Sequence, residues 1–188
     1  MRIRIWGLAI GLAALVAAAS LSPCISGENR IIAPAGVPTP AFEPAAKPKR
    51  KLLSFTLADL HGRRVKLSAW HGHPLIVDFW ATWCPPCRKE VPELNAIYKK
   101  YRSKGLVVLG LSVDKVQGDG VKSVRPFAQE FKISYPILMA NEEVVDAMGV
   151  DNIPTTLFFN RNGKLTARLE GRGKSGELAA AAQGLFRD

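Results

Sequence analysis

Residues 74–87 read PLIVDFWATWCPPC, and most of what the sequence predicts follows from them. Their first half is a nearly continuous apolar run, which is typical of a buried strand. Their second half holds Cys84 and Cys87, separated by two prolines. Proline suits the first position of a helix, because the N–H that it lacks would have no partner there. We therefore predict a buried strand that leads directly into a helix, with both cysteines at the start of that helix.

Cysteines three positions apart at the start of a helix are suited to disulfide exchange. Their Cβ atoms lie about 5–6 Å apart on one face, so the two sulfurs can bond after a small adjustment. Unpaired N–H groups and the positive helix end favour the thiolate of Cys84, which is the attacking form of a cysteine. We predict that Cys84 attacks a substrate disulfide and that Cys87 resolves the mixed disulfide, leaving a Cys84–Cys87 bond. This redox-active disulfide is the only redox group that the reaction needs, so no separate cofactor is expected.

Cys87 needs a group that takes its proton, and two carboxylates are candidates. Asp78 interrupts the apolar run, where an ionised carboxylate is costly unless the position is a strand end that reaches solvent. Glu90 follows Cys87 by three residues on the same helical face, although polar helix residues commonly face water. Burial would raise the pKa of either carboxyl and make it a better proton acceptor for a thiol.

Two structural explanations of the cysteine pair are less well supported than disulfide exchange. A static disulfide across so short a loop would constrain the unfolded chain little. A zinc site could combine the cysteines with His71 and His73, which gives the usual number of ligands. The two histidines precede the buried strand and the cysteines follow it, however, so they should lie at its opposite ends. We therefore expect no metal.

The remainder of residues 52–188 predicts one α/β domain. Apolar alternation around residues 60–62 predicts a β-hairpin at its start, and Asn162-Gly163 predicts a second hairpin near its end. Further strands are predicted over residues 74–80, 106–113, 137–139, 155–159 and 165–169. Helices are predicted from residue 85 to the stop at Gly105, over 124–132 with Ser123 as its cap, over 142–148, and after a cap at Ser175.

Residues 77–87, VDFWATWCPPC, resemble the thioredoxin superfamily, and the form FWATWCPPC resembles its bacterial extracytoplasmic TlpA/ResA-like branch, which is related to the redoxin and AhpC/TSA proteins. Further matches are Phe55-x-Leu57, His61-Gly62, Glu90, Pro92, Leu111-x-Val113-Asp114, Tyr135-Pro136 and Ile153-Pro154-Thr155-Thr156. The resemblance covers residues 52–188. It implies a thioredoxin-like fold, a central mixed β-sheet flanked by helices, with an N-terminal β-hairpin and a β-α insertion over residues 113–148.

The same resemblance implies roles for individual residues. Pro154 should be a cis proline that faces the disulfide, and the backbone of Ile153 should pair with bound substrate. Glu90 matches the acidic residue of the ResA-like branch, whereas Asp78 matches the buried acid of thioredoxin itself, so either can serve Cys87. Pro92 should kink the active-site helix. The implied substrate-binding residues are Trp83, Pro85, Pro86, Ile153, Pro154 and Thr155.

These observations predict a thiol-disulfide oxidoreductase, acting as a reductase on extracytoplasmic proteins. The resemblance implies apocytochrome c as a substrate and a membrane protein as the electron donor. A thiol peroxidase is the alternative enzyme, although no Thr-x-x-Cys motif is present. A metallochaperone or peptide-binding module is the alternative from another class. Copper-handling relatives use Cys-x3-Cys and a downstream His, whereas this chain has Cys-x2-Cys and no His after His73.

The first 51 residues predict export and tethering. Arg2 and Arg4 precede an uncharged apolar run over residues 5–19, as in a secretory signal. Residues 1–24 are a cleaved signal, an uncleaved anchor or a lipoprotein signal, in which case Cys24 is acylated. Residues 25–51 contain repeated Pro and Ala, which favour an extended tether. All three outcomes place the domain outside the cytoplasm, facing the periplasm.

The net charge of +10 does not imply a nucleic-acid partner. Residues 52–188 carry 19 basic and 14 acidic side chains, so half of the excess lies outside the predicted domain. Mixed signs at this level are typical of a soluble surface. No dimerisation segment is recognisable, and we expect a monomer.

Overall fold

The apolar run before the cysteines forms an interior strand of the β-sheet. A computed structural model describes residues 51–117 and 120–187. In it β3 (Leu75–Trp80) is buried along its whole length. It pairs in parallel with β4 (Val107–Ser112) and antiparallel with β6 (Thr155–Phe159). Both neighbours are buried strands, so they shield the C-terminal end of β3, which leads to the cysteines, from water on both sides.

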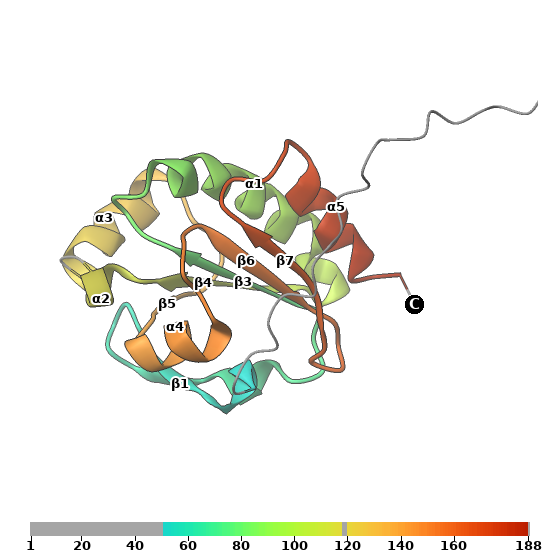
Figure 1. The fold of residues 1–188 in the computed structure, drawn as a ribbon, viewed down its shortest axis with the longest axis horizontal. Helices are drawn as coiled ribbons and strands as arrows, with labels where there is room; N and C mark the ends of the chain where they lie inside the picture. The colour runs from blue at the N-terminus through green and yellow to red at the C-terminus, as the bar shows by residue number, and fades with distance from the viewer. Residues whose placement is uncertain (1–50, 118–119, 188) are drawn as a thin grey trace, which may run out of the picture. The chain divides into compact units, whose positions relative to one another are not determined.

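Seven strands form one mixed sheet, in the order β2-β1-β5-β4-β3-β6-β7 (Figure 1). The predicted first hairpin is β1 (Thr56–Asp59) and β2 (Arg64–Lys66), with Leu57 opposite Val65. The second hairpin joins β6 to β7 (Leu165–Glu170). β5 (Ile137–Met139) lies between β4 and β1 and attaches the first hairpin to the sheet. The predicted mixed sheet with an N-terminal hairpin is confirmed.

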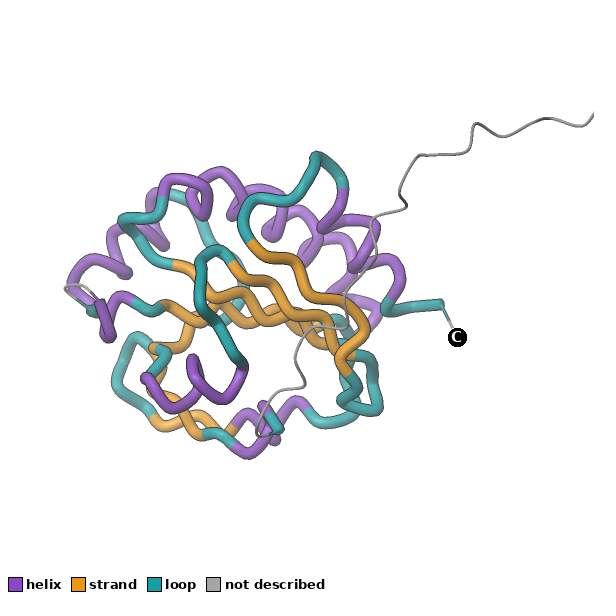
Figure 2. Tube along the Cα trace, in the orientation of Figure 1, coloured by secondary structure: helices purple, strands orange, loops and turns teal. Residues whose placement is uncertain are grey.

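Helices cover both faces of this sheet, as Figure 2 shows. On one face the core joins β3, β4 and β6 to α1 (Pro85–Tyr101) and α5 (Glu177–Gly184). On the other face it includes η1 (Leu52–Ser54), η2 (Leu67–Trp70) and α4 (Glu142–Met148). The other helices are η3 (Arg102–Lys104), α2 (Asp114–Gln117) and α3 (Val121–Glu130). Alternate residues of β3 therefore face either α1 or the opposite core.

Two predicted helix starts are wrong. α3 begins at Val121, after Gly120, and the Ser123 hydroxyl donates to the Gly120 carbonyl inside the helix instead of capping it. α5 begins after Gly176, which has a left-handed φ of 84°, and Ser175 makes no cap. The N-cap is Gly176, and the carboxylate of Glu177, the first residue of the helix, instead accepts the backbone N–H of Lys174 in the preceding loop at 2.9 Å.

The predicted export segment, the lipidation candidate Cys24 and the Pro/Ala-rich tether lie outside the described residues. Within 51–117 and 120–187, no helix has the length and apolar character needed to cross a bilayer.

Candidate active site

The two cysteines lie at the N-terminus of α1, as predicted. Cys84 is the N-cap of the helix and is joined to Cys87 by a disulfide, with the two Cα atoms 5.3 Å apart. The backbone N–H of Cys87 donates to Cys84 Sγ at 3.2 Å. Cys84 is 3% exposed and Cys87 is 1% exposed. The geometry directs an N–H group and the positive helix end at Cys84 Sγ, which favours a thiolate there after reduction.

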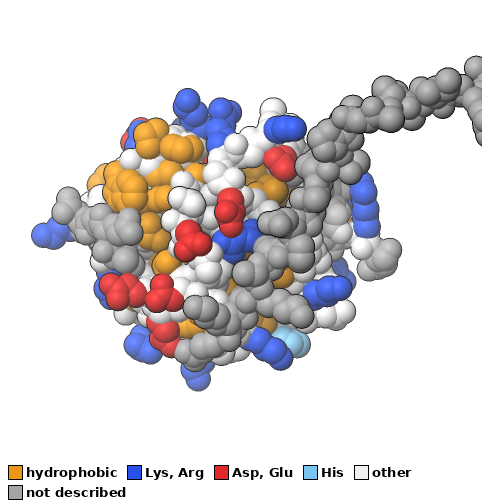
Figure 3. Space-filling view, viewed as in Figure 1, with side chains coloured by type: hydrophobic (Ala, Val, Ile, Leu, Met, Phe, Trp, Pro, Cys, Tyr) orange, Lys and Arg blue, Asp and Glu red, His pale blue; other side chains and the backbone are white. Residues whose placement is uncertain are grey.

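Apolar surface adjoins the buried disulfide. Trp83 is 49% exposed, and among the described residues it is the exposed large hydrophobic side chain. Pro85 is exposed and Pro86 is half-buried. Figure 3 shows hydrophobic side chains gathered over α3 and the start of α1. The three residues predicted to bind substrate on this side therefore border the disulfide in an accessible position.

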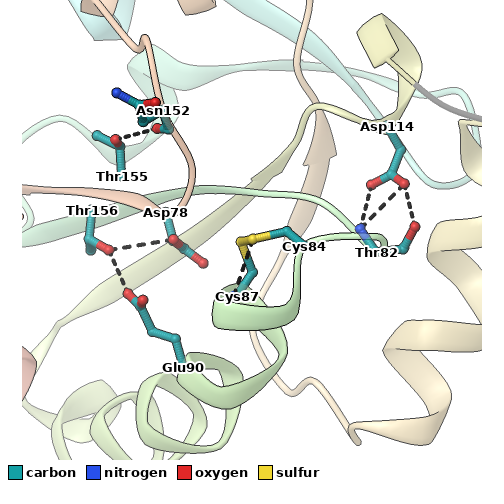
Figure 4. The surroundings of a disulfide bond; sticks show 9 residues. All are labelled: Asp78, Thr82, Cys84, Cys87, Glu90, Asp114, Asn152, Thr155 and Thr156. Atoms are coloured by element: carbon teal, nitrogen blue, oxygen red, sulfur yellow. Dashed lines mark hydrogen bonds between the residues drawn. A yellow bond between two sulfur atoms is a disulfide. The ribbon is translucent and has the colours of Figure 1, made fainter. Parts of the chain in front are cut away.

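The two predicted proton acceptors come together on the α1 side of the sheet. Asp78 is 1% exposed in the middle of β3, and Glu90 is 5% exposed on α1. Neither is the solvent-facing residue that the alternative interpretation required. Thr156 of β6 lies directly opposite Asp78 in the strand pairing, and its Oγ1 is 3.4 Å from Asp78 Oδ1 and 2.8 Å from Glu90 Oε1. Figure 4 shows the Asp78 carboxyl group pointing toward the disulfide and Thr156 between the two acids.

Burial raises the pKa of both acids. Desolvation, reinforced by the charge of Glu90, holds the pKa of Asp78 well above its ordinary value, against a lowering by the Thr156 hydroxyl. Desolvation also raises the pKa of Glu90; Thr156 and Arg172 lower it, while Glu93 raises it further. A buried carboxyl with a raised pKa can exchange a proton with a thiol.

A glycine opens space for a tyrosine beside this pair. Gly110 of β4 pairs with Asp78, and a Cβ atom there would lie 2.8 Å from Trp80 Nε1 and 3.1 Å from Tyr135 Cε2. The Tyr135 hydroxyl is buried and, within the described residues, has no hydrogen-bond partner. Desolvation raises its pKa well above the usual range, and the charges of Asp78 and Glu90 raise it further. Tyr135 therefore stays uncharged beside the two acids.

Asp114 is a functional candidate that the sequence reasoning did not single out beyond its place in the family motif. It is fully buried at the end of β4, and its carboxylate accepts the backbone N–H of Thr82 at 3.1 Å, the Thr82 hydroxyl and the Ser112 hydroxyl at 2.8 Å. These bonds fix the loop just before Trp83 and Cys84. An acid that directly follows a buried strand was the signal that could have identified it.

The remaining predicted substrate-binding residues lie at the end of the loop before β6 and at the first position of that strand. The Ile153–Pro154 peptide bond is cis, which is the isomer that the resemblance implies, and its position facing the disulfide stays a prediction. The Thr155 hydroxyl donates to the Asn152 carbonyl at 2.6 Å. Arg168 of β7 donates to the carbonyls of Met148 and Gly149 at 2.8 and 2.6 Å, which ties the C-terminus of α4 to the sheet. The loop is thus fixed by the Thr155–Asn152 hydrogen bond within it and by the Arg168 hydrogen bonds at its start.

The histidines of the zinc interpretation lie apart from the cysteines along β3. His71 and His73 are exposed and precede that strand, and His73 Nδ1 is 3.1 Å from the Gly105 carbonyl. Across 51–117 and 120–187, no three His, Cys, Asp or Glu side chains are grouped so that they could hold a metal ion.

Comparisons with known proteins agree with this geometry. The model of the AhpC/TSA family matches residues 48–168. The thiol-disulfide oxidoreductase ResA of Geobacillus thermodenitrificans is 35% identical over 118 residues, which cover 62% of this chain and 66% of the relative. ResA of Bacillus subtilis is 32% identical over 119 residues, covering 63% and 64%. The chain thus spans slightly less than two thirds of the length of these relatives.

A solved structure shows the same fold. The thiol:disulfide interchange protein of the thioredoxin family from Chlorobium tepidum has a TM-score of 0.63 and 26% identity, covering 71% of this chain and 94% of that chain. The family model alone spans well over half of the chain. The chain belongs to the AhpC/TSA family and has a thioredoxin-like fold.

Proposed function

We propose that this protein is a thiol-disulfide oxidoreductase that reduces disulfides of extracytoplasmic proteins. The observation that carries the proposal is the Cys84–Cys87 disulfide at the N-terminus of α1, where Cys84 Sγ accepts the Cys87 N–H. The names of the ResA relatives support the reaction class.

Reduction of a substrate begins with the reduced enzyme. The Cys84 thiolate attacks one sulfur of the substrate disulfide, the substrate S–S bond breaks, and the other substrate sulfur leaves as a thiolate. Cys84 and the substrate are now joined by a mixed disulfide. The Cys87 thiol then gives up its proton and its sulfur attacks Cys84 Sγ. The second substrate thiolate leaves, the substrate has gained two electrons, and the enzyme carries the Cys84–Cys87 bond.

Re-reduction requires a dithiol donor, and we propose a membrane protein in that role. It attacks the Cys84–Cys87 bond and becomes oxidised as the two cysteines recover their electrons. For the substrate we propose apocytochrome c, whose two cysteine thiols must be free before haem is attached. The direction of the reaction depends on the reduction potentials of all three proteins.

Substrate is proposed to bind as an extended segment across the disulfide. Trp83, Pro85 and Pro86 supply apolar contact on one side. The backbone of Ile153, next to cis Pro154 and Thr155, supplies hydrogen bonds on the other. A surface made of backbone and apolar groups accepts many sequences, which suits a reductase of unfolded proteins.

Trapping of mixed disulfides tests the proposal. In Cys87→Ala the resolving thiol is missing, so Cys84 should retain disulfide-linked substrate proteins that mass spectrometry can identify. Cys84→Ser is the matched control and should trap none. Cys24→Ala in the Cys87→Ala background should trap the same partners, which removes Cys24 as the linking residue.

Activity measurements complete the test. The wild-type chain should accelerate the reduction of insulin by dithiothreitol, and Cys84→Ser should not. Absence of both trapped partners and insulin reduction would overturn the proposal. Consumption of hydrogen peroxide with no turnover of insulin would assign the protein to the peroxidases instead. Peptide binding that survives Cys84→Ser, without any redox activity, would favour a binding module.

A further inference from the structure

The two buried acids share one hydroxyl group. Asp78 and Thr156 are direct partners across β3 and β6, so their side chains leave the sheet on the same face, toward Glu90 of α1. Thr156 Oγ1 lies 2.8 Å from Glu90 Oε1 and 3.4 Å from Asp78 Oδ1. A threonine hydroxyl has one hydrogen to donate and two lone pairs that accept. It can therefore donate to one acid only, and it can accept from the other.

This count of hydrogens determines how the pair is protonated. If both acids were ionised, one buried carboxylate would face a lone pair and would also repel its neighbour. With one proton on Asp78, that carboxyl donates to Thr156 Oγ1, and Thr156 donates to ionised Glu90. Thr156 Oγ1 lies closer to Glu90 Oε1, at 2.8 Å, than to Asp78 Oδ1, at 3.4 Å, which favours Glu90 as the acceptor of the hydroxyl hydrogen. In this arrangement Asp78 carries the proton and Glu90 is the anion.

We propose that Thr156 relays protons between Asp78 and Glu90, so that the two acids remove the Cys87 proton in series. This inference rests on the proposed oxidoreductase function and assigns a positioning residue to its second step. It also gives both acids a role, where the sequence offered them as alternatives.

The transfer conserves every proton. Asp78 passes its proton to Thr156 Oγ1 as Thr156 passes its own to Glu90 Oε1. Asp78, now a carboxylate, takes the proton of the Cys87 thiol. The Cys87 thiolate attacks Cys84 Sγ and displaces the substrate thiolate. Both acids are then neutral, Thr156 has regained a hydrogen, and Glu90 returns the surplus proton to solvent.

Charged and titratable groups surround the pair on several elements. At the acceptor end the charge of Glu93 disfavours the Glu90 anion and the charge of Arg172 favours it. Tyr135 faces both acids from the segment before β5 and stays neutral. The Cys84–Cys87 disulfide lies at the Asp78 end (Figure 4). The proposed transfer therefore moves the negative charge from Glu90 to Asp78, which faces the disulfide.

Three variants of the full-length chain separate the relay from packing. Thr156→Val keeps the shape of the side chain and removes the hydroxyl, whereas Thr156→Ser keeps the hydroxyl. Thr166→Val is the matched control, because Thr166 is exposed on β7 and its hydroxyl donates to the Phe158 carbonyl at 3.1 Å, away from both acids.

The readout is single turnover of each reduced variant with a fluorescence-quenched peptide disulfide. Release of the first thiol reports attack by Cys84, and release of the second reports resolution by Cys87. Thr156→Val should slow the second release at least about tenfold at pH 6.5 and leave the first unchanged; the threshold is set below the roughly 10²–10⁴-fold contribution of a positioned acid or base. The deficit should shrink as the pH rises to 9, because hydroxide then competes with the relay for the Cys87 proton. Thr156→Ser and Thr166→Val should match the wild type.

Different failures have different meanings. If the wild type turns over the peptide and Thr156→Val resolves the mixed disulfide equally fast at pH 6.5, the relay is overturned and the oxidoreductase function stands. A deficit in Thr156→Val that is unchanged at pH 9, or shared by Thr156→Ser, would identify a packing role and also overturn it. In Asp78→Asn, the further change Thr156→Val should have no effect, because groups in series are not additive. If the wild type itself shows no thiol release, it is the proposed function that fails.

Discussion

Asp78 is the residue at which stability and chemistry oppose each other most directly. It is buried in β3, and its pKa in the folded protein is raised by desolvation and by Glu90. Unfolding exposes the carboxyl to water and restores its ordinary pKa near 4. Above that pH the unfolded state loses the proton while the folded state keeps it, so the folded state binds more protons. The free energy of unfolding must then decrease as pH rises toward the folded pKa.

Asp78→Asn should remove this pH dependence. Asn does not titrate and can donate to Thr156 as the neutral acid does. We expect the variant to melt at least about 2 °C above the wild type at pH 8, with the gain shrinking toward pH 4. Thermal unfolding followed by circular dichroism at the two pH values measures it. Asp146→Asn, an exposed change on α4, is the control and should show no such trend. A wild type as stable as Asp78→Asn at pH 8 would contradict the expectation.

The residues of the site differ in how far sequence can reveal them. Cys84, Cys87 and Glu90 are visible because they occupy neighbouring turns of one helix, and Asp78 because it breaks an apolar run. Thr156 lies 78 residues from Asp78 and meets it only through the register of β3 and β6. Threonine is common in strands, so nothing local marks Thr156 as part of the site.

Elements with strong local signals were predicted well. β5, β6 and α4 have the predicted bounds, and β3 starts one residue later than the apolar run. The predicted starts of α3 and α5 are wrong because serine is a common N-cap residue, yet neither Ser123 nor Ser175 caps its helix. A left-handed glycine precedes both helices instead. Glycine at these positions looks like loop composition until the backbone angles are known.

The loop between β3 and α1 depends on an acid from another element. Asp114 begins α2 and accepts hydrogen bonds from Thr82 and Ser112. Asp114→Asn would place amide hydrogens against these donors, and a buried group left without its partner costs about 1–3 kcal/mol. We expect the free energy of unfolding in urea to fall by that amount. Alkylation of Cys84 in the reduced variant should also change in rate, because the loop before it is released.

A matched variant identifies the cause. Ser112→Ala removes one donor to the carboxylate and the acceptor of the Asp114 backbone N–H, but it leaves the carboxylate bonded to Thr82, so it should release the loop less than Asp114→Asn does. Equal stability of Asp114→Asn and the wild type would show that the bonds to Thr82 do not hold the loop.

The charge of the whole chain is unevenly distributed, and this bears on where it works. Half of the net charge of +10 lies before residue 52, beside the apolar run and Cys24. We propose that Cys24 is acylated and holds the domain at a membrane surface facing the periplasm. Cys24→Ala should then move the protein out of the membrane fraction without changing insulin reduction by the purified chain. Cys84→Ser should abolish insulin reduction and leave the protein in the membrane fraction.

Mass spectrometry of the mature N-terminus checks this assignment. A lipid-modified Cys24 is expected at the first position. An unmodified chain that starts at Ser20 would exclude lipidation and leave a cleaved signal.

The direct pairing of Asp78 with Thr156 also constrains which changes the sheet can accept. Side chains alternate between the two faces of a strand, so one residue inserted or deleted in the loop before β6 would turn Thr156 to the opposite core if the strand slipped to compensate. The sheet could keep its hydrogen bonds and the helix its cysteines, yet the two acids would lose the hydroxyl between them. Length changes in that loop are therefore expected to be tolerated by the fold and rejected by the reaction.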